Sequence, residues 1–189
     1  MSIKLIVGLQ NPGSMYEQTR HNVGAWFVQA LAKHHGGKFK SDSKLHGALC
    51  RITLDGYDCR LLLPSTFMNN SGLAIQATAH FFKIKPDEIL VIHDELDLPA
   101  GLAKLKTGGG HGGHNGLRNT ISQLKTTDFH RLRLGIGHPG HKDLVHDYVL
   151  SKPSLADKQA IHDAIEKALC VMHHTVEGDM AKAMNKLHS

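Results

Sequence analysis

His21 and Asp94 are the two residues whose types and positions best fit chemistry. His21 lies just before Asn22, the expected N-cap of a helix, and Asp94 ends a strongly apolar run. The positive end of a helix dipole disfavours an imidazolium, so this position predicts a neutral ring that can accept a proton. A carboxylate at a strand end could fix the tautomer of that ring. The pair therefore predicts general-base activation of water.

Other reaction types find less support. There is no GxSxG segment and no cysteine with an activating neighbour, which argues against a covalent intermediate. Gly8 and Gly13 have P-loop spacing, but Ser14 and Met15 follow them in place of Lys-Ser/Thr, which argues against nucleotide binding. Asp94 and Asp97 resemble paired carboxylates or a Mg²⁺ site. Because no further acidic cluster lies nearby, we expect Asp94 to act alone as an orienting carboxylate.

The glycine-rich segment 108–116, GGGHGGHNG, allows three interpretations. It fits a flexible surface loop. Its histidines, His111 and His114, could share a metal ion, but without an HExxH motif or a Cys/His set we expect no metal. It also fits a backbone-rich wall that a bulky polar substrate can approach closely, with Asn115 both capping the next helix and offering amide hydrogen bonds.

The segment 64–72, PSTFMNNSG, joins an expected strand to an expected helix. Asn69, Asn70 and Ser71 are all good N-cap residues, and we expect one of them to cap the helix. Together with Phe67, the two amides could equally form a shelf that stacks on a substrate and hydrogen-bonds to it.

The elements that must position these residues alternate between strand-like and helix-like patterns. This predicts an α/β fold in which residues 1–189 form a single domain with a central mixed, largely parallel β-sheet surrounded by helices. The expected strands are 4–9, two on either side of Asp55-Gly56 within 47–64, 88–94 and 130–137. The expected helices follow Asn22, begin near Ser71, follow Asn115 and begin near Leu155. Loops 10–22, 64–71 and 94–115 should converge beyond the carboxyl ends of the strands.

Composition sets broad limits on class and partner. With 189 residues, 41% of them apolar and 21% charged, the chain can bury a core of its own. Three cysteines without CxxC spacing suit a reducing compartment, and the N-terminus lacks a signal-peptide pattern, so we expect a cytoplasmic protein. The net charge of +5 fits either a mildly basic protein or a polyanionic partner. Basic residues gather between residues 104 and 133, which favours the latter.

Five segments, taken together, resemble the bacterial-type peptidyl-tRNA hydrolases in order and in spacing. They are LIVGLQNPGSMYEQTRHNVG, PSTFMNNSG, HDELDLPAG, GGGHGGHNGLR and HRLRLGIGHPG. The resemblance implies a monomeric α/β domain without a metal or other cofactor and without an obligate protein partner or membrane attachment. It also implies hydrolysis of the ester that joins a peptide to the 3′-terminal ribose of tRNA.

The resemblance also implies roles for individual residues. His21 would be the catalytic base, Asp94 its supporting carboxylate, and Asn11 the residue that contacts the peptide and requires a blocked α-amino group. The residues lining the site for the peptide and the terminal adenosine would be Tyr16, Phe67, Asn69 and Asn115. Lys106 and Arg133 would hold the tRNA 5′-phosphate, and His114 would be an accessory residue.

The sequence leaves two alternative functions open. An RNA-binding module that has lost its chemistry could share this fold, although the presence of both His21 and Asp94 argues against it. A metal-dependent hydrolase that uses His111 and His114 is the other alternative.

Overall fold

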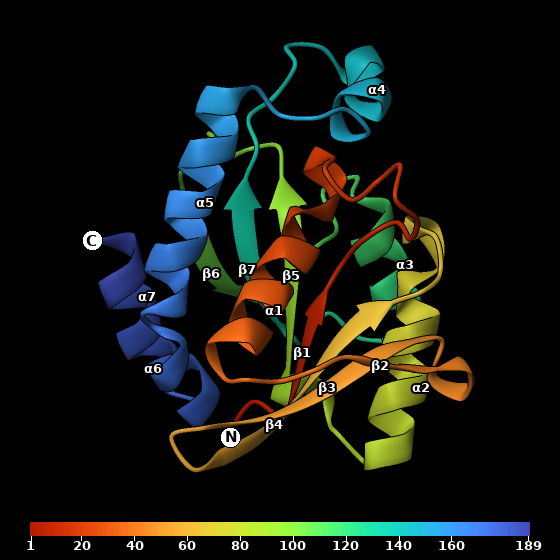
Figure 1. Cartoon of the computed structure of the whole chain (residues 1–189), viewed down its shortest axis with the longest axis vertical. Coiled ribbons are helices and arrows are strands. Elements are labelled where there is room, and N and C mark those ends of the chain that lie inside the picture. The colour runs from red at the N-terminus through yellow and green to blue at the C-terminus, as the bar shows by residue number, and fades with distance from the viewer.

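A seven-stranded mixed sheet runs through the molecule, and the computed structural model describes all residues from 1 to 189 (Figure 1). Its strand order is β2-β3-β4-β1-β5-β7-β6. The strands are β1 Leu5–Gly8, β2 Lys40–Asp42, β3 Gly47–Leu54, β4 Tyr57–Pro64, β5 Ile89–Glu95, β6 Ala103–Thr107 and β7 His130–Gly135. The central strands β4, β1, β5 and β7 are parallel, while β2, β3 and β6 pair antiparallel. The expected mixed, largely parallel sheet is confirmed.

Helices cover both faces of the sheet, as expected for a single α/β domain. The helices are α1 Val23–His34, α2 Ser71–Phe82, α3 Asn115–Leu124, α4 Val145–Val149, α5 Leu155–Leu169, α6 Met172–Glu177 and α7 Met180–His188. The period-2 alternation of the strands sends Ile6 and Ile92 into a core under α1 and α5, and Val7 and Val91 into a second core under α2 and α3.

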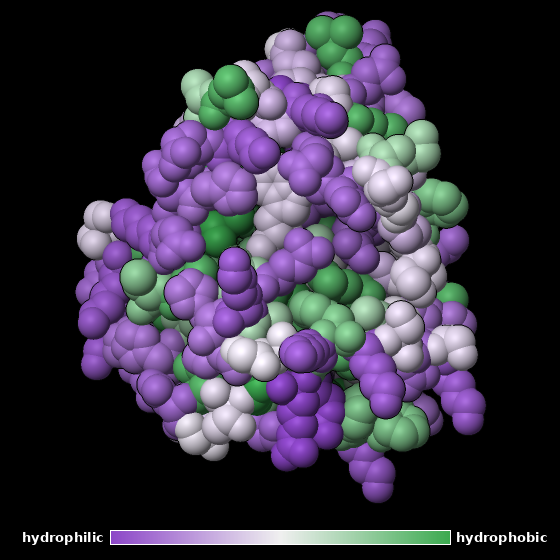
Figure 2. Space-filling model, in the orientation of Figure 1, coloured by the Kyte–Doolittle hydropathy of each residue, from purple (hydrophilic) through white to green (hydrophobic).

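The surface in Figure 2 is mainly hydrophilic, with several separate hydrophobic areas. None of the helices combines the length and the apolar character that crossing a membrane requires.

The hairpin predicted around Asp55-Gly56 is confirmed. Strands β3 and β4 pair in register from Gly47↔Pro64 to Leu54↔Tyr57. Asp55 and Gly56 have φ angles of 48° and 83°, the two positive values that a tight two-residue turn of this hand requires.

Gly24 brings the start of α1 unusually close to the sheet. A Cβ atom at Gly24 would collide with the backbone carbonyl of Ile92 on β5. Because α1 starts against β5 in this way, His21 lies next to Asp94, the residue two positions beyond Ile92. The close approach of two backbones thus positions the first candidate pair.

The sequence prediction was incomplete at the edges of the sheet. The expected loop 94–115 contains strand β6, and strand β2 was not expected. The C-terminal helical region divides into α5, α6 and α7, with Gly178 ending α6 in the left-handed conformation (φ 94°).

Candidate active site

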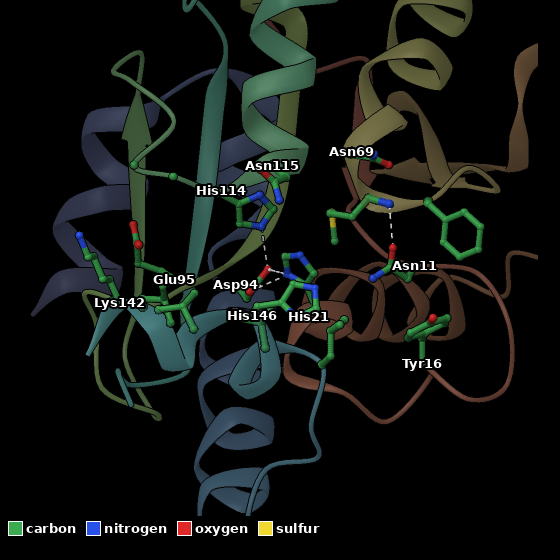
Figure 3. A pocket seen from close by; sticks show the side chains of 18 residues that line it. Asn11, Tyr16, His21, Asn69, Asp94, Glu95, His114, Asn115, Lys142 and His146 are labelled. Atoms are coloured by element: carbon green, nitrogen blue, oxygen red, sulfur yellow. Dashed lines mark hydrogen bonds and ion pairs between the residues drawn. The ribbon is translucent and has the colours of Figure 1, made fainter. Parts of the chain in front are cut away.

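A pocket of about 510 Å³ opens among residues at the carboxyl ends of the parallel strands and in the segment that contains α4 (Figure 3). It collects eight of the candidate residues: Asn11, Tyr16, His21, Phe67, Asn69, Asp94, His114 and Asn115. They come from the three loops that were expected to converge. The segment that contains α4 supplies further lining residues that the sequence did not single out, among them Lys142, Val145 and His146.

His21 and Asp94 form a buried hydrogen-bonded pair. The Nδ1 of His21 lies 3.0 Å from Oδ1 and 2.9 Å from Oδ2 of Asp94. A carboxylate only accepts, so Nδ1–H donates and the lone pair of Nε2 is left for the pocket. Only 11% of the His21 side chain and 2% of the Asp94 side chain are exposed. The ring is therefore held in the tautomer that a general base needs.

The electrostatics at His21 differ from the expectation drawn from its helix-start position. Burial lowers the pKa of His21, but the charge of Asp94 and its hydrogen bond outweigh burial, so the net pKa is raised. Burial also opposes ionisation of Asp94, yet His21 and His114 hold the pKa of Asp94 well below its usual range. The helix start was expected to disfavour the imidazolium, whereas the contact with Asp94 favours it, and the net pKa is raised.

His114 makes a second hydrogen bond to the same carboxylate. Its Nε2 lies 2.7 Å from Oδ1 of Asp94. Its Nδ1 accepts from the backbone N–H groups of Gly116 and Leu117 at the start of α3. Two donors on Nδ1 place the proton on Nε2, so Nε2–H donates to Asp94. His114, and not Asn115, is the N-cap of α3, which corrects the sequence expectation.

His21, Asp94 and His114 also have the spacing of a three-ligand metal site, with their donor atoms within 4.8 Å of one another. The hydrogen bonds argue for protons in place of an ion. Coordination through Nε2 of His114 would require loss of its only N–H proton while two backbone amides still occupy Nδ1. His111, the partner suggested by the sequence, instead accepts from the N–H of Gly113 within its own loop.

Asn11 offers an amide donor to the pocket. Its Oδ1 accepts from the N–H of Met68 at 2.7 Å, which leaves the Nδ2 group on the His21 side (Figure 3). The side chain of Asn22 fixes the backbone of Asn11 through two hydrogen bonds of 2.9 Å: its Oδ1 accepts from the N–H of Asn11, and its Nδ2 donates to the C=O of Asn11. Asn22 is the N-cap residue of α1, as predicted, but its side chain makes no capping hydrogen bond to the helix.

The far wall of the pocket is aromatic. The rings of Tyr16 and Phe67 meet edge to face, with centroids 6.2 Å apart, and Phe67 is 58% exposed. Asn69 also lines the pocket. The helix cap expected from Asn69, Asn70 or Ser71 is absent: Asn70 stands at the N-cap without a side-chain bond. These groups are therefore available to a ligand that stacks and hydrogen-bonds.

Asn115 lies on the other side of the pocket from Tyr16 (Figure 3). The Oδ1 of Asn115 accepts from Nη1 of Arg118 at 3.0 Å, so the amide N–H groups of Asn115 are free. Asn115 also lines the pocket.

Arg20 ties the α4 segment to the residue next to the candidate base. Its Nη1 donates to the carbonyl of Tyr148 (3.1 Å) and to Oγ of Ser151 (2.6 Å), and its guanidinium lies 3.9 Å from the centre of the Tyr148 ring. The Tyr148 hydroxyl donates to the carbonyl of Ile136. No sequence pattern indicates this contact, because it joins residues more than 120 positions apart.

Lys106 and Arg133 lie outside the pocket lining. They stand on the paired strands β6 and β7, where Lys104 faces Arg133 and Lys106 faces Arg131. Residues that face each other share one face of a sheet, so Lys106 and Arg133 are diagonal neighbours, typically about 7–8 Å apart. Such a pair can contact one phosphate from two sides.

Arg131 shapes the glycine-rich segment from within. It is a fully buried arginine, and its guanidinium donates to the carbonyls of Gly109 and Gly110. Burial and the nearby Arg133 lower the pKa of Arg131. Arg131 and Arg133 share one face of β7, but only Arg131 is buried in a structural role. Arg133 stays partly exposed, with 23% of its side chain accessible.

Residues 5–189 match the family model described as peptidyl-tRNA hydrolase. The chain belongs to the peptidyl-tRNA hydrolase family. A relative from Legionella pneumophila (strain Lens), named peptidyl-tRNA hydrolase, is 60% identical over 189 residues and covers 100% of both chains. A relative of the same name from Coxiella burnetii (strain RSA 331 / Henzerling II) is 56% identical over 187 residues, covering 99% of this chain and 98% of its own.

Solved structures of the peptidyl-tRNA hydrolase family share the fold. The crystal structure of peptidyl-tRNA hydrolase from Acinetobacter baumannii superposes with a TM-score of 0.96 at 49% identity, covering 99% of this chain and 95% of that chain. The crystal structure of a complex of peptidyl-tRNA hydrolase with n-propanol gives a TM-score of 0.97, also at 49% identity and with the same coverage. The resemblance inferred from the five sequence segments is confirmed at the level of family and fold.

Proposed function

We propose that this chain hydrolyses the ester between a peptide, or an N-blocked aminoacyl group, and the 3′-terminal ribose of tRNA, and so frees the tRNA for reuse in translation. The observation that carries this proposal is the His21–Asp94 pair, which leaves one imidazole lone pair facing a pocket with amide donors. Membership of the peptidyl-tRNA hydrolase family supports the substrate class. We further propose that the protein acts as a cytoplasmic monomer without a metal or cofactor.

The base in this mechanism is His21. Its Nε2 takes a proton from a water molecule as the oxygen of that water attacks the ester carbonyl. Asp94 then faces an imidazolium, whose charge it stabilises at the 2.9 Å separation of the pair. No protein nucleophile is required, because an ester is reactive enough for attack by an activated water. As the bond between the carbonyl carbon and the ribose oxygen breaks, the imidazolium of His21 gives its Nε2 proton to that oxygen, and His21 is neutral again.

The oxyanion that forms at the ester carbonyl needs hydrogen-bond donors. Asn11 presents Nδ2–H groups that are fixed by two sets of hydrogen bonds, one to Met68 and one to Asn22. Donors held in place before the reaction lose no energy to reorganisation as charge develops. The same amide could contact the peptide next to a blocked α-amino group.

Binding of the rest of the substrate would divide between two surfaces. Tyr16, Phe67 and Asn69 form one wall and Asn115 the other, and these walls suit an adenine base and a short peptide. Lys106 and Arg133 would contact the 5′-phosphate of the acceptor stem. Phosphate contacts add affinity and register without selecting a sequence, which fits an enzyme that accepts many tRNAs.

The test is release of tRNA from N-acetyl-aminoacyl-tRNA, measured beside the same tRNA carrying a free α-amino group. We expect turnover of the blocked substrate and much slower turnover of the free one, both unchanged after exhaustive chelation. Binding of the blocked substrate without release would overturn the proposal in favour of an RNA-binding module. Loss of activity on chelation would replace it with a metal-dependent reaction.

A further inference from the structure

The C-terminal helix α7 closes the open edge of the sheet. Strand β6 is the last strand in the sheet order and pairs with β7 on one side only. Helix α7 packs against its other side (Figure 1), with Ala183 and Leu187 buried. An edge strand leaves backbone N–H groups without partners, and a helix that covers the edge must satisfy or exclude them.

His188 satisfies one of these groups. The backbone N–H of Leu105, at the centre of β6, donates to Nε2 of His188 at 3.0 Å. This bond requires a lone pair on Nε2, and hence a neutral ring. Burial, followed by the charges of Lys104 and Arg133, lowers the pKa of His188 and so favours the neutral form.

The bond lies between the two lysines of β6. Leu105 separates Lys104 from Lys106, and the side chains of both lysines share the face that carries Arg133. The position of β6 along its edge therefore sets where the ammonium group of Lys106 stands relative to Arg133. An edge strand held on one side only can fray or shift, whereas a strand bonded on both sides is fixed.

We propose that His188 is a positioning residue for the phosphate-binding pair, acting through the Leu105 backbone to hold Lys106 at its spacing from Arg133. This inference rests on the proposed function, because it assumes that Lys106 and Arg133 receive the tRNA 5′-phosphate. His188 itself touches no substrate. Its ring is otherwise exposed, so its removal leaves no cavity in the core.

The test compares kcat/KM on N-acetyl-aminoacyl-tRNA that carries a 5′-phosphate with kcat/KM on the same tRNA with a 5′-hydroxyl. The ratio of the two values isolates the phosphate contact. We expect His188→Ala to lower this ratio by roughly two- to tenfold, the factor that one neutral hydrogen bond supplies. The value for the 5′-hydroxyl substrate should stay at the wild-type level.

Two further variants separate positioning from folding. His188→Gln places an amide oxygen near the position of Nε2 and should restore the ratio. Asn185→Ala, an exposed change on the same helix, should leave the ratio unaltered. Amide hydrogen exchange at Leu105 should accelerate in His188→Ala and return towards the wild-type rate in His188→Gln.

A wild-type ratio in His188→Ala, or an equal loss on both substrates, would overturn the inference. So would a wild-type enzyme that releases both tRNAs equally well, since it would have no phosphate site to position. A wild-type chain that releases neither tRNA would instead refute the proposed function itself.

Discussion

Replacing Asp94 with asparagine tests how the carboxylate acts on His21. Asparagine keeps the size of the side chain and one carbonyl oxygen, which can still accept from His21 and from His114 at the position of Oδ1. The negative charge is lost. The variant therefore separates the charge of Asp94 from its role as a hydrogen-bond acceptor.

The expected magnitude follows from the loss of charge at one hydrogen bond. A hydrogen bond to a charged group contributes about 1.5–3 kcal/mol and a neutral one about 0.5–1.5 kcal/mol. The difference, about 1–1.5 kcal/mol, matters most in the transition state, where His21 becomes an imidazolium. Since each 1.36 kcal/mol is tenfold in rate, we expect kcat/KM to fall about tenfold, and further if His21 also changes tautomer.

The pH profile supplies the more specific signature. Asp94 raises the pKa of His21, and activity requires the neutral ring, so wild-type kcat/KM should fall as pH falls through that raised value. Removing the charge lowers the pKa of His21, so the acid limb of Asp94→Asn should move to lower pH even as the maximum falls. Steady-state release of N-acetyl-aminoacyl-tRNA from about pH 5 to 9 measures both effects.

Asp97→Asn is the matched control for this experiment, because Asp97 is exposed three positions further along and lies outside the pocket lining. It should keep both the wild-type rate and the wild-type profile. An acid limb for Asp94→Asn that stays in place or moves to higher pH would refute the assignment of that limb to His21.

Four more substitutions test other parts of the site. Asn11→Asp replaces the Nδ2 donor with an acceptor, and kcat should fall roughly 10²–10³-fold, as for a lost oxyanion donor; a change below threefold would remove Asn11 from that role. Gly24→Ala forces a Cβ against the Ile92 carbonyl and should displace His21, with a loss of up to about 10²-fold in kcat while the fold stays intact by circular dichroism. Lys106→Ala and Arg133→Ala should each raise KM for full tRNA far more than for a short ester, and reduce the salt slope of binding by about 1. Equal effects on both substrates would exclude a phosphate contact.

The central strands were predictable because their signal is local. The runs 4–9 and 88–94 are short and mainly apolar and contain β-branched residues, and both are central strands. Strand β6 was missed because its alternation of apolar and basic residues covers only AKLK, a run too short to stand out between the Pro/Gly-containing segment before it and the glycine-rich segment after it. It becomes a strand through pairing with β7, a partner more than 20 residues away, and through the cover provided by α7.

In the candidate site, too, the features with a local sequence signal were predictable and those set by tertiary contacts were not. The pairing of His21 with Asp94 followed from a helix start and a strand end that parallel topology brings together. The capping role of His114 could not be read from propensity, which favours Asn115. The imidazole caps α3 because its other nitrogen reaches Asp94, a contact set by tertiary structure. The raised pKa of His21 could not be read from the helix start either, since it depends on how closely Asp94 approaches.

The most direct test of the account is the rate of release from N-acetyl-aminoacyl-tRNA by His21→Ala at saturating substrate. General-base help is worth about 10²–10⁴-fold, so kcat should fall within that range while substrate binding persists. His80→Ala, an exposed histidine on α2 outside the pocket lining, should behave as wild type. A His21→Ala enzyme that turns over within a few-fold of the wild-type rate would contradict the assignment of His21 as the base.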